Sequence, residues 1–376
     1  MENYKSKNWD FFKEELPHHR LPFSKKNWGN KRHSLCSYQG KLKPAIAYHL
    51  IKAFAPENGK IFDPFAGVGT VPFEASLNGI KTFGMDISSL AYYVTNAKIG
   101  ITSLRESNEY IGRLNTFIQN NQVSEKELTL YSVFGLNRTL KEYYEDETFK
   151  EILLARRFFQ QYTPSTPSEC VVVSSMLHIL HGNRPYALSR KSHPIIPYAP
   201  TGDFIYKNLV KKLYEKVNRF YSEVVPKDFM GGKMFMQDST KNWPDEIENL
   251  DSIITSPPFF DSTRFYVSNW IRLWFCGWEP NDFTKNAKRY IDERQKRTFF
   301  VYRPILSQAK ERLKLGGTFV FHLGKSKKCD MGKVLQSMSK PWFTHSELFV
   351  ESVEHCAKFG IKDLGTVTDH EYLILW

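Results

Sequence analysis

The chain has 376 residues, 41% of them hydrophobic and 15% aromatic, a composition that supports a packed core and excludes disorder as the default. Its 52 Lys and Arg residues against 40 Asp and Glu give a net charge of +12, which fits a nucleic-acid partner as well as it fits an ordinary basic protein. Because no stretch approaches roughly 18 apolar residues, the N-terminus lacks a secretory pattern and the five cysteines form no Cys-x-x-Cys pair, we expect a cytoplasmic protein with no membrane partner, no disulfide framework and no metal site.

The first hundred residues predict strands and helices in alternation. Apolar residues at helical spacing, such as Ile46, Leu50 and Phe54, indicate helices, and the short apolar runs between them indicate strands. This order predicts a parallel sheet with helices packed on its faces. The expected elements are a helix over 45–54, a strand over 60–62, a helix over 68–77, a strand over 82–85 and a helix over 89–98.

The next stretch, residues 101–230, has a mainly helical pattern. We interpret it as an insertion that separates the first part of an α/β domain, 1–100, from its second part, 231–376. The expected helices are 104–119, 143–161, 171–181 and 204–221, with a Pro-rich basic loop over 182–202 before the last one.

Strand signals return after the insertion. Two apolar runs at the end of the chain, 348–353 and 372–376, are expected to form an antiparallel pair at the edge of the sheet. With them we count about seven strands, so the predicted fold class is α/β, with a mostly parallel seven-stranded sheet, an antiparallel edge strand and a mainly helical insertion. The other expected elements are strands over 233–236, 252–255 and 318–323 and a helix over 299–313 that ends at Gly316-Gly317.

A glycine-bearing loop follows the first predicted strand. Gly67 and Gly69 let the backbone approach a ligand closely, and the carboxyl end of this strand is where an open α/β sheet binds its ligand. The loop has no Lys that would hold a phosphate, and Asp63 at its entrance would repel one. A carboxylate there suits the positively charged amino acid end of S-adenosylmethionine.

Two further acidic residues follow strands at the same edge of the predicted sheet. Asp86 can grip the ribose hydroxyls, and Asp238 can accept from an adenine amino group. Either residue alone would be interpreted as a helix N-cap. Three aspartates at three successive strand ends, together with the glycine loop, predict a cofactor that carries a nucleoside. The candidate cofactor-binding residues in these segments are Asp63, Phe65, Ala66, Gly67, Gly69, Thr70, Asp86, Ile87, Asp238 and Ser239.

A strand over 252–255 runs directly into Ser256, Pro257, Pro258 and Phe259. Prolines fix φ and lack the N–H donor, so this turn presents carbonyl oxygens to whatever lies beside it. By itself the pattern could be an ordinary strand terminator. Beside a cofactor loop it indicates a catalytic turn.

The segments 63–70 and 255–259 together resemble the DNA amino-methyltransferases, which make N4-methylcytosine or N6-methyladenine with S-adenosylmethionine. Residues 37–44, which include Lys43, resemble the motif that lines the methionine end of the cofactor in that family, so Lys43 joins the cofactor candidates. The resemblance covers about 27–98 and 232–376. It implies a class I methyltransferase Rossmann-like fold, with an N-terminal basic segment and the cofactor-binding half in 1–100 and the catalytic half in 231–376. It does not account for the helical insertion 101–230, which we expect to serve in target recognition.

The resemblance also implies the roles of the catalytic turn. The Ser256 hydroxyl and the Pro257 carbonyl would accept the two hydrogens of an exocyclic amino group, and Phe259 would stack on a base flipped out of the duplex. Neither a metal nor a covalent intermediate is required. Cytosine C5 chemistry would need a Pro-Cys nucleophile, and no cysteine here follows a proline.

The serine form of the turn is more typical of cytosine N4 enzymes, so we expect an N4-cytosine DNA methyltransferase. The alternatives are an N6-adenine DNA methyltransferase, an RNA base methyltransferase and an inactive relative that binds nucleic acid. Two departures leave the base preference open: the family most often has Tyr where this chain has Phe259, and the insertion is not in the commoner position for target recognition.

Two basic and aromatic stretches, 20–33 and 184–198, are candidates for contacting DNA, with solvated basic loops as the alternative. Arg264, just after the catalytic turn, is a candidate for the flipped nucleotide or its phosphate. We expect DNA as the partner, and the resemblance also allows a cognate restriction endonuclease. The candidate substrate-binding residues are Arg184, Arg190, Lys191 and Arg264.

Overall fold

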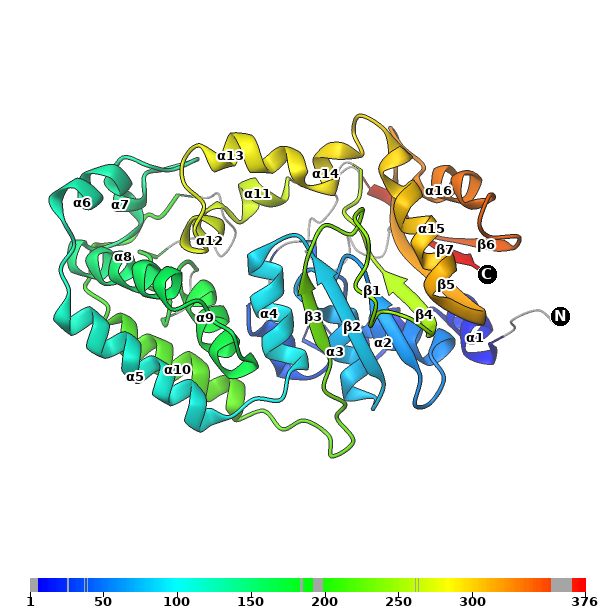
Figure 1. Ribbon diagram of the computed structural model, residues 1–376, viewed down its shortest axis with the longest axis horizontal. Helices are drawn as coiled ribbons and strands as arrows, with labels where there is room; N and C mark the ends of the chain where they lie inside the picture. Colours follow the sequence, from blue (N-terminus) through cyan, green and yellow to red (C-terminus); the bar gives the residue numbers. More distant parts are fainter. Residues whose placement is uncertain are drawn as a thin grey trace.

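The computed structural model describes residues 6–25, 27–36, 38, 40–182, 185–191, 199–260, 262, 264–352 and 367–376. Its centre is one sheet with the strand order β3-β2-β1-β4-β5-β7-β6 (Figure 1). This confirms the predicted fold class, a seven-stranded α/β sheet with a helical addition. The strands are β1 Lys60–Asp63, β2 Lys81–Asp86, β3 Lys233–Met236, β4 Leu250–Thr255, β5 Leu313–Ser326, β6 Ser346–Ser352 and β7 Val367–Leu375.

The strand directions follow from how the strands are connected. Strands β1 to β5 pair in parallel, whereas β7 runs antiparallel to both β5 and β6. The predicted antiparallel pair at the end of the chain is therefore confirmed, with β7 second from the edge and β6 outermost; residue 353 lies outside the described residues. Gly316 and Gly317 were expected to end a helix. They lie instead inside β5, where Gly316 has a φ of +80°.

Each face of the sheet has its own set of helices. Ile61 is buried on the face covered by α1 (Lys7–Glu15), α2 (Pro44–Phe54) and α3 (Thr70–Leu77). Its neighbour Phe62 is buried on the other face with α15 (Arg303–Arg312) and α16 (Met331–Ser339), because successive side chains of a strand alternate. Since both faces are covered, ligands reach the sheet at the carboxyl ends of its strands.

The helices α5 to α10, which we call the helical unit, lie beside α4 (Figure 1). Two helices of this unit begin later than the sequence predicts. Glu145 accepts hydrogen bonds from the N–H groups of Glu147 and Thr148, which ends one helix and starts the next, and Asn208 caps a helix that was expected from residue 204. The helices are α4 Ser89–Ile99, α5 Leu104–Asn120, α6 Glu125–Ser132, α7 Leu140–Tyr143, α8 Asp146–Gln161, α9 Pro167–Ile179 and α10 Leu209–Tyr221.

The core of the helical unit includes a second segment of the chain. Trp270 and Trp274, on α12 (Trp270–Phe275), are fully buried in it, although they follow the catalytic turn. Arg156 of α8 joins the two segments, because its guanidinium donates to the Trp274 carbonyl (2.8 Å) and to Glu279 (2.6 Å). The predicted boundaries of the insertion, 101–230, therefore omit part of its core.

A run of short helices continues from this segment across the sheet to α15 (Figure 1). No helix in the part of the chain that the structure describes combines the length and the apolarity needed to cross a membrane. The short helices are α11 Phe265–Ser268, α13 Asp282–Lys285 and α14 Ile291–Arg294, and the 3-10 turns are Pro17–His19, Lys31–Ser34, Asn286–Arg289 and Phe299–Tyr302.

Candidate cofactor and catalytic site

The glycine loop connects β1 to α3 and requires its glycines. Gly67 and Gly69 have φ of +52° and +70°, a left-handed conformation that other residues adopt only with strain. A Cβ on Gly69 would lie 2.6 Å from Thr95 Oγ1, and a Cβ on Gly67 would lie 2.5 Å from Tyr38 Oη. The loop therefore brings backbone, without side chains, to the carboxyl end of β1.

Two buried carboxyl groups hold this loop. Asp63 accepts from Phe65 N (3.0 Å), and Asp86 accepts from Gly67 N (3.0 Å) and Ser88 N (2.9 Å). Burial raises the pKa of Asp63 to about 7 and that of Asp86 to about 6, against the hydrogen bonds that favour their ionised forms. Both groups have no cationic partner among these contacts, so they are suited to a ligand that brings positive charge or hydroxyl donors.

The loop and the catalytic turn open into the same pocket. Gly67 and Ser256 both line it, so the two predicted sites share one cleft. Burial and the carboxyl groups of Asp86 and Asp63 raise the pKa of Tyr38, which also lines this pocket, well above its ordinary value. The lining residues are Tyr38, Gly40, Lys41, Leu42, Asp63, Phe65, Ala66, Gly67, Val68, Thr70, Val71 and Ser256.

Not every predicted cofactor residue lies in this pocket. Lys43 is exposed at the start of α2, whereas its neighbours Lys41 and Leu42 line the pocket. Gly69, the N-cap of α3, and the neighbours Asp86 and Ile87 are not among the lining residues either. For these four residues, cofactor contact remains a prediction.

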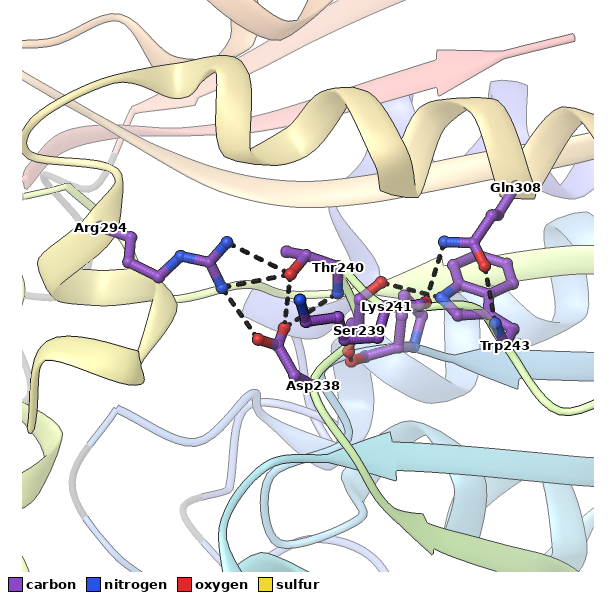
Figure 2. Close-up of polar contacts among 8 residues, drawn as sticks. Asp238, Ser239, Thr240, Lys241, Trp243, Arg294 and Gln308 are labelled. Carbon is purple, nitrogen blue, oxygen red and sulfur yellow. Dashed lines mark hydrogen bonds and ion pairs between the residues drawn. The ribbon is translucent and has the colours of Figure 1, made fainter. Parts of the chain in front are cut away.

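Asp238 and Ser239, after β3, are already engaged by the protein (Figure 2). Asp238 accepts from Thr240 N (2.9 Å) and Oγ1 (2.8 Å) with one oxygen and pairs with Arg294 of α14 (3.0 Å) with the other. Ser239 is buried and donates to the Pro64 carbonyl, which ties β3 to the glycine loop. Contact of Asp238 with an adenine amino group stays a prediction, and Ser239 positions the loop.

The catalytic turn begins where β4 ends, and its backbone is held by side chains. Thr255 Oγ1 donates to Asp63 (2.5 Å), which links the turn to the glycine loop. Gln295 Nε2 donates to the Pro258 carbonyl (2.9 Å), and Tyr302 in turn donates to Gln295 Oε1 (2.8 Å). Gln295 is only 1% exposed, so its amide is oriented by these two bonds.

Phe259 lies over a glycine of β5. A Cβ on Gly324 would be 2.4 Å from Phe259 Cδ2, so only glycine leaves room for this ring. The Phe259 ring centroid is 5.5 Å from that of His322 and 6.1 Å from that of His370. Ser256 Oγ lies 3.0 Å from His322 Nδ1. No local sequence pattern marks Gln295, His322 or Gly324 as part of the site, because each is remote along the chain from the turn that it supports.

The predicted substrate-binding residues are not gathered at this pocket. Arg190 donates to the carbonyls of Gly202 and Glu142 and stacks on Phe204 at 4.0 Å, so its guanidinium is occupied within the helical unit. Lys191 is exposed. Arg184 lies outside the described residues.

Arg264, at the start of α11, is exposed and bonds to Tyr266 (3.2 Å) and Glu293 (3.1 Å). Among the candidate substrate-binding residues that the structure describes, Lys191 and Arg264 are exposed to solvent.

One group of ligand-type side chains converges near β6 within the described ranges. His18 and His19 both place Nε2 against one oxygen of Glu351, at 2.9 and 2.5 Å, and Tyr372 donates to its other oxygen (2.8 Å). These hydrogen bonds lower the pKa of Glu351 against the opposing effect of burial. The carboxylate is therefore satisfied by three protein donors.

The pocket fits S-adenosylmethionine by the chemistry of its residues. Asp63 and the backbone of the glycine loop line the pocket, and the carboxyl group of Asp63 suits the cationic amino acid end of this cofactor. Asp86 is not among the lining residues, so its contact with the ribose hydroxyls remains a prediction. When bound, this group supplies an electrophilic methyl carbon.

Comparison with known proteins supports a methyltransferase. Residues 31–139, less than a third of the chain, match the family model described as UPF0020, RMKL-like, methyltransferase domain. The match includes the glycine loop and supports S-adenosylmethionine as the cofactor, as the sequence predicts. No curated protein matches the chain significantly.

The chain also has a low similarity to solved structures. The chain is similar to a TehB-like SAM-dependent methyltransferase from Corynebacterium glutamicum (10% identity, 88% of this chain and 85% of that chain, TM-score 0.32). It is similar to an rRNA methylase from Streptococcus thermophilus (6%, 89% and 96%, 0.34) and to the rRNA methyltransferase aviRa from Streptomyces viridochromogenes (9%, 91% and 88%, 0.32). At such low scores and identities, a likeness identifies neither substrate nor activity.

Proposed function

We propose that this protein transfers a methyl group from S-adenosylmethionine to the exocyclic N4 of cytosine in DNA, after the base has been flipped out of the duplex. The observation that supports it most is that Ser256 and Gly67 line one pocket, with Asp63 hydrogen-bonded to the residue before Ser256. A methyl donor held by the glycine loop and a base held by the turn would thus meet in the same cleft.

The residues of the turn suit an amino group as the nucleophile. The lone pair of an exocyclic amino nitrogen is delocalised into the ring, and two acceptors on its hydrogens favour the geometry in which that lone pair points outward. The Ser256 hydroxyl and the Pro257 carbonyl are two such acceptors, and no N–H of Pro257 or Pro258 competes with them. Holding the nitrogen in line with the methyl carbon then supplies much of the rate.

Phe259, three residues after Ser256, supplies the aromatic surface of the turn. With one side of its ring against Gly324, this residue has a fixed support from β5. A flipped base could stack on the other side of the ring. Stacking does not need the hydroxyl of the Tyr that the resembling family most often has at this position.

Adenine N6 in DNA is the rival substrate, because the same two acceptors serve either amino group. The serine form of the turn favours cytosine through the family resemblance. An RNA base and a catalytically inactive relative are the other outcomes that an experiment has to separate.

The proposal is tested by replacing the turn. Ser256→Ala and Phe259→Ala should lower methyl transfer to nucleic acid by on the order of 100-fold, because each removes a contact made to the target base. Binding of S-adenosylmethionine, measured by calorimetry, should stay within about threefold of the wild type, since neither side chain belongs to the glycine loop. Loss of cofactor binding with transfer per bound cofactor unchanged would contradict these roles.

A further inference from the structure

Ser256 has a partner on the neighbouring strand. Its Oγ lies 3.0 Å from Nδ1 of His322, which is on β5 and only 4% exposed. Thr255 pairs with Phe321 in the register of β4 and β5, so the two residues that follow, Ser256 and His322, lie side by side at the pocket. This contact joins a residue of the proposed catalytic turn to the imidazole of His322, to which the proposed function assigns no role.

The polarity of this hydrogen bond decides how Ser256 meets a base. If His322 donates from Nδ1, the serine hydrogen is free to point into the pocket, where it suits a carbonyl oxygen. If Ser256 donates to a bare Nδ1, its hydrogen is held on the histidine side. Its oxygen lone pairs then face the pocket, where they suit the N–H of an amino group.

The surroundings of His322 favour the second arrangement. Its Nε2 is buried and has no hydrogen-bond partner among the described residues. The ring centroids of His370, Tyr372 and Phe259 lie 4.8, 5.2 and 5.5 Å from its own. Among aromatic neighbours an N–H group is tolerated better than a nitrogen lone pair, which favours the tautomer with the proton on Nε2.

The surroundings of His322 also favour the neutral form of its ring. Burial lowers the pKa of His322 well below its ordinary value, and the nearby His370, His18 and Lys43 act in the same direction, against Glu351. A neutral ring with its proton on Nε2 leaves Nδ1 as an acceptor for the Ser256 hydroxyl.

We propose that His322 is a positioning residue, which fixes the Ser256 hydroxyl as a hydrogen-bond acceptor and thereby makes the pocket select bases with an exocyclic amino group over bases with a carbonyl. This inference rests on the proposed function of Ser256. In the reaction, the amino nitrogen forms the new bond to the methyl carbon, the carbon–sulfur bond breaks with its electron pair on sulfur, and one amino proton leaves to water. His322 neither gains nor loses a proton.

The tautomer can be measured without any substrate. In protein labelled with 15N at histidine, the ring shifts of His322, assigned with the His322→Asn variant, should show Nδ1 unprotonated and Nε2 protonated at pH 7.5. The Ser256→Ala variant should move the Nδ1 resonance and leave that of Nε2 nearly in place. A protonated Nδ1 in the wild type would overturn the inference, whatever the activity.

Two variants test the consequence for methyl transfer. His322→Ala should lower kcat by about 10- to 100-fold with the KM for S-adenosylmethionine nearly unchanged, because Ser256 loses its fixed polarity. His322→Asn should keep kcat within about fivefold of the wild type, because the side-chain carbonyl of Asn stands near the place of Nδ1 and can accept from Ser256.

The outcomes separate this inference from the proposed function. If the wild type methylates a mixture of unmethylated DNA fragments and both variants match it, or both are equally impaired, the inference fails and the function stands. If the wild type methylates no DNA, the proposed function fails and the selection of bases fails with it, whereas the tautomer of His322 still tests how the Ser256 hydroxyl is oriented.

Discussion

Cofactor binding should depend on pH through Asp63, because burial raises the pKa of this group to about 7. Asp63 is 3% exposed and lines the pocket at the place suited to the cationic amino acid end of S-adenosylmethionine. A cation prefers the ionised carboxylate, so binding should strengthen as pH rises through 7 and should release protons.

The magnitude follows from the ionised fraction. For a carboxyl group with a pKa of about 7, this fraction is roughly 0.9 at pH 8 and roughly 0.1 at pH 6, so the affinity should fall about tenfold between these values. Asp86, with a pKa of about 6, is half protonated at the lower limit and adds at most about a factor of two. Binding at pH 7 should release roughly half a proton, since that is the protonated fraction of Asp63.

Isothermal titration calorimetry measures both quantities. The Kd is followed from pH 6 to 8.5, and titrations in buffers of different ionisation enthalpy count the protons released. Asp63→Asn should bind more weakly and lose the pH dependence, whereas Asp245→Asn, at a fully exposed carboxylate, should behave as the wild type. An affinity that is constant across this range, or stronger at pH 6, would refute the assignment of Asp63 to the cationic end.

Three further substitutions test how the pocket is built. Gly324→Ala places a Cβ 2.4 Å from Phe259 Cδ2, so it should displace that ring and lower methyl transfer at least about tenfold while cofactor binding is kept. Gln295→Leu removes the donor to the Pro258 carbonyl and should lower kcat by on the order of tenfold, measured by transfer of labelled methyl groups. Lys191→Ala removes an exposed charge and should lower the slope of log affinity for DNA against log salt by about one.

The controls come from the same chain. Gly112→Ala, at a helical glycine with open space around its Cβ position, should leave transfer unchanged and stabilise the protein by about 0.5–1 kcal/mol. Normal transfer by Gly324→Ala would mean that Phe259 does not need its observed position. An unaltered salt slope for Lys191→Ala would remove this lysine from the DNA interface.

The local parts of the site could be predicted from the sequence. From Asp63, at the end of β1, to Asp86, at the end of β2, the chain forms a loop, a helix and a strand in direct succession, so the glycines and both carboxyl groups can be recognised from the local sequence pattern. The turn at Ser256 is equally local. Its supports are not, because Gln295 and His322 reach it from segments 37 and 66 residues away.

Long-range contacts also determine features that no local pattern in the sequence shows. Arg190 belongs to a basic stretch, but the carbonyls that occupy its guanidinium come from Glu142 and Gly202. The core of the helical unit extends to Trp270, because apolar residues after the turn pack against helices that precede it. The glycine pair at 316–317 has the composition of a helix end, and only the pairing of β5 with β4 shows that it lies inside a strand.

The most direct test of the central claim is to identify the methylated nucleoside. The protein is incubated with labelled S-adenosylmethionine and, separately, with unmethylated DNA fragments and unmodified RNA, and the digested products are separated. We predict label in N4-methylcytosine from DNA, and none when Ser256 is replaced by Ala. Label in N6-methyladenine would transfer the same mechanism to the rival base, whereas label at cytosine C5, label in RNA alone, or full transfer by the Ser256→Ala variant would contradict the account.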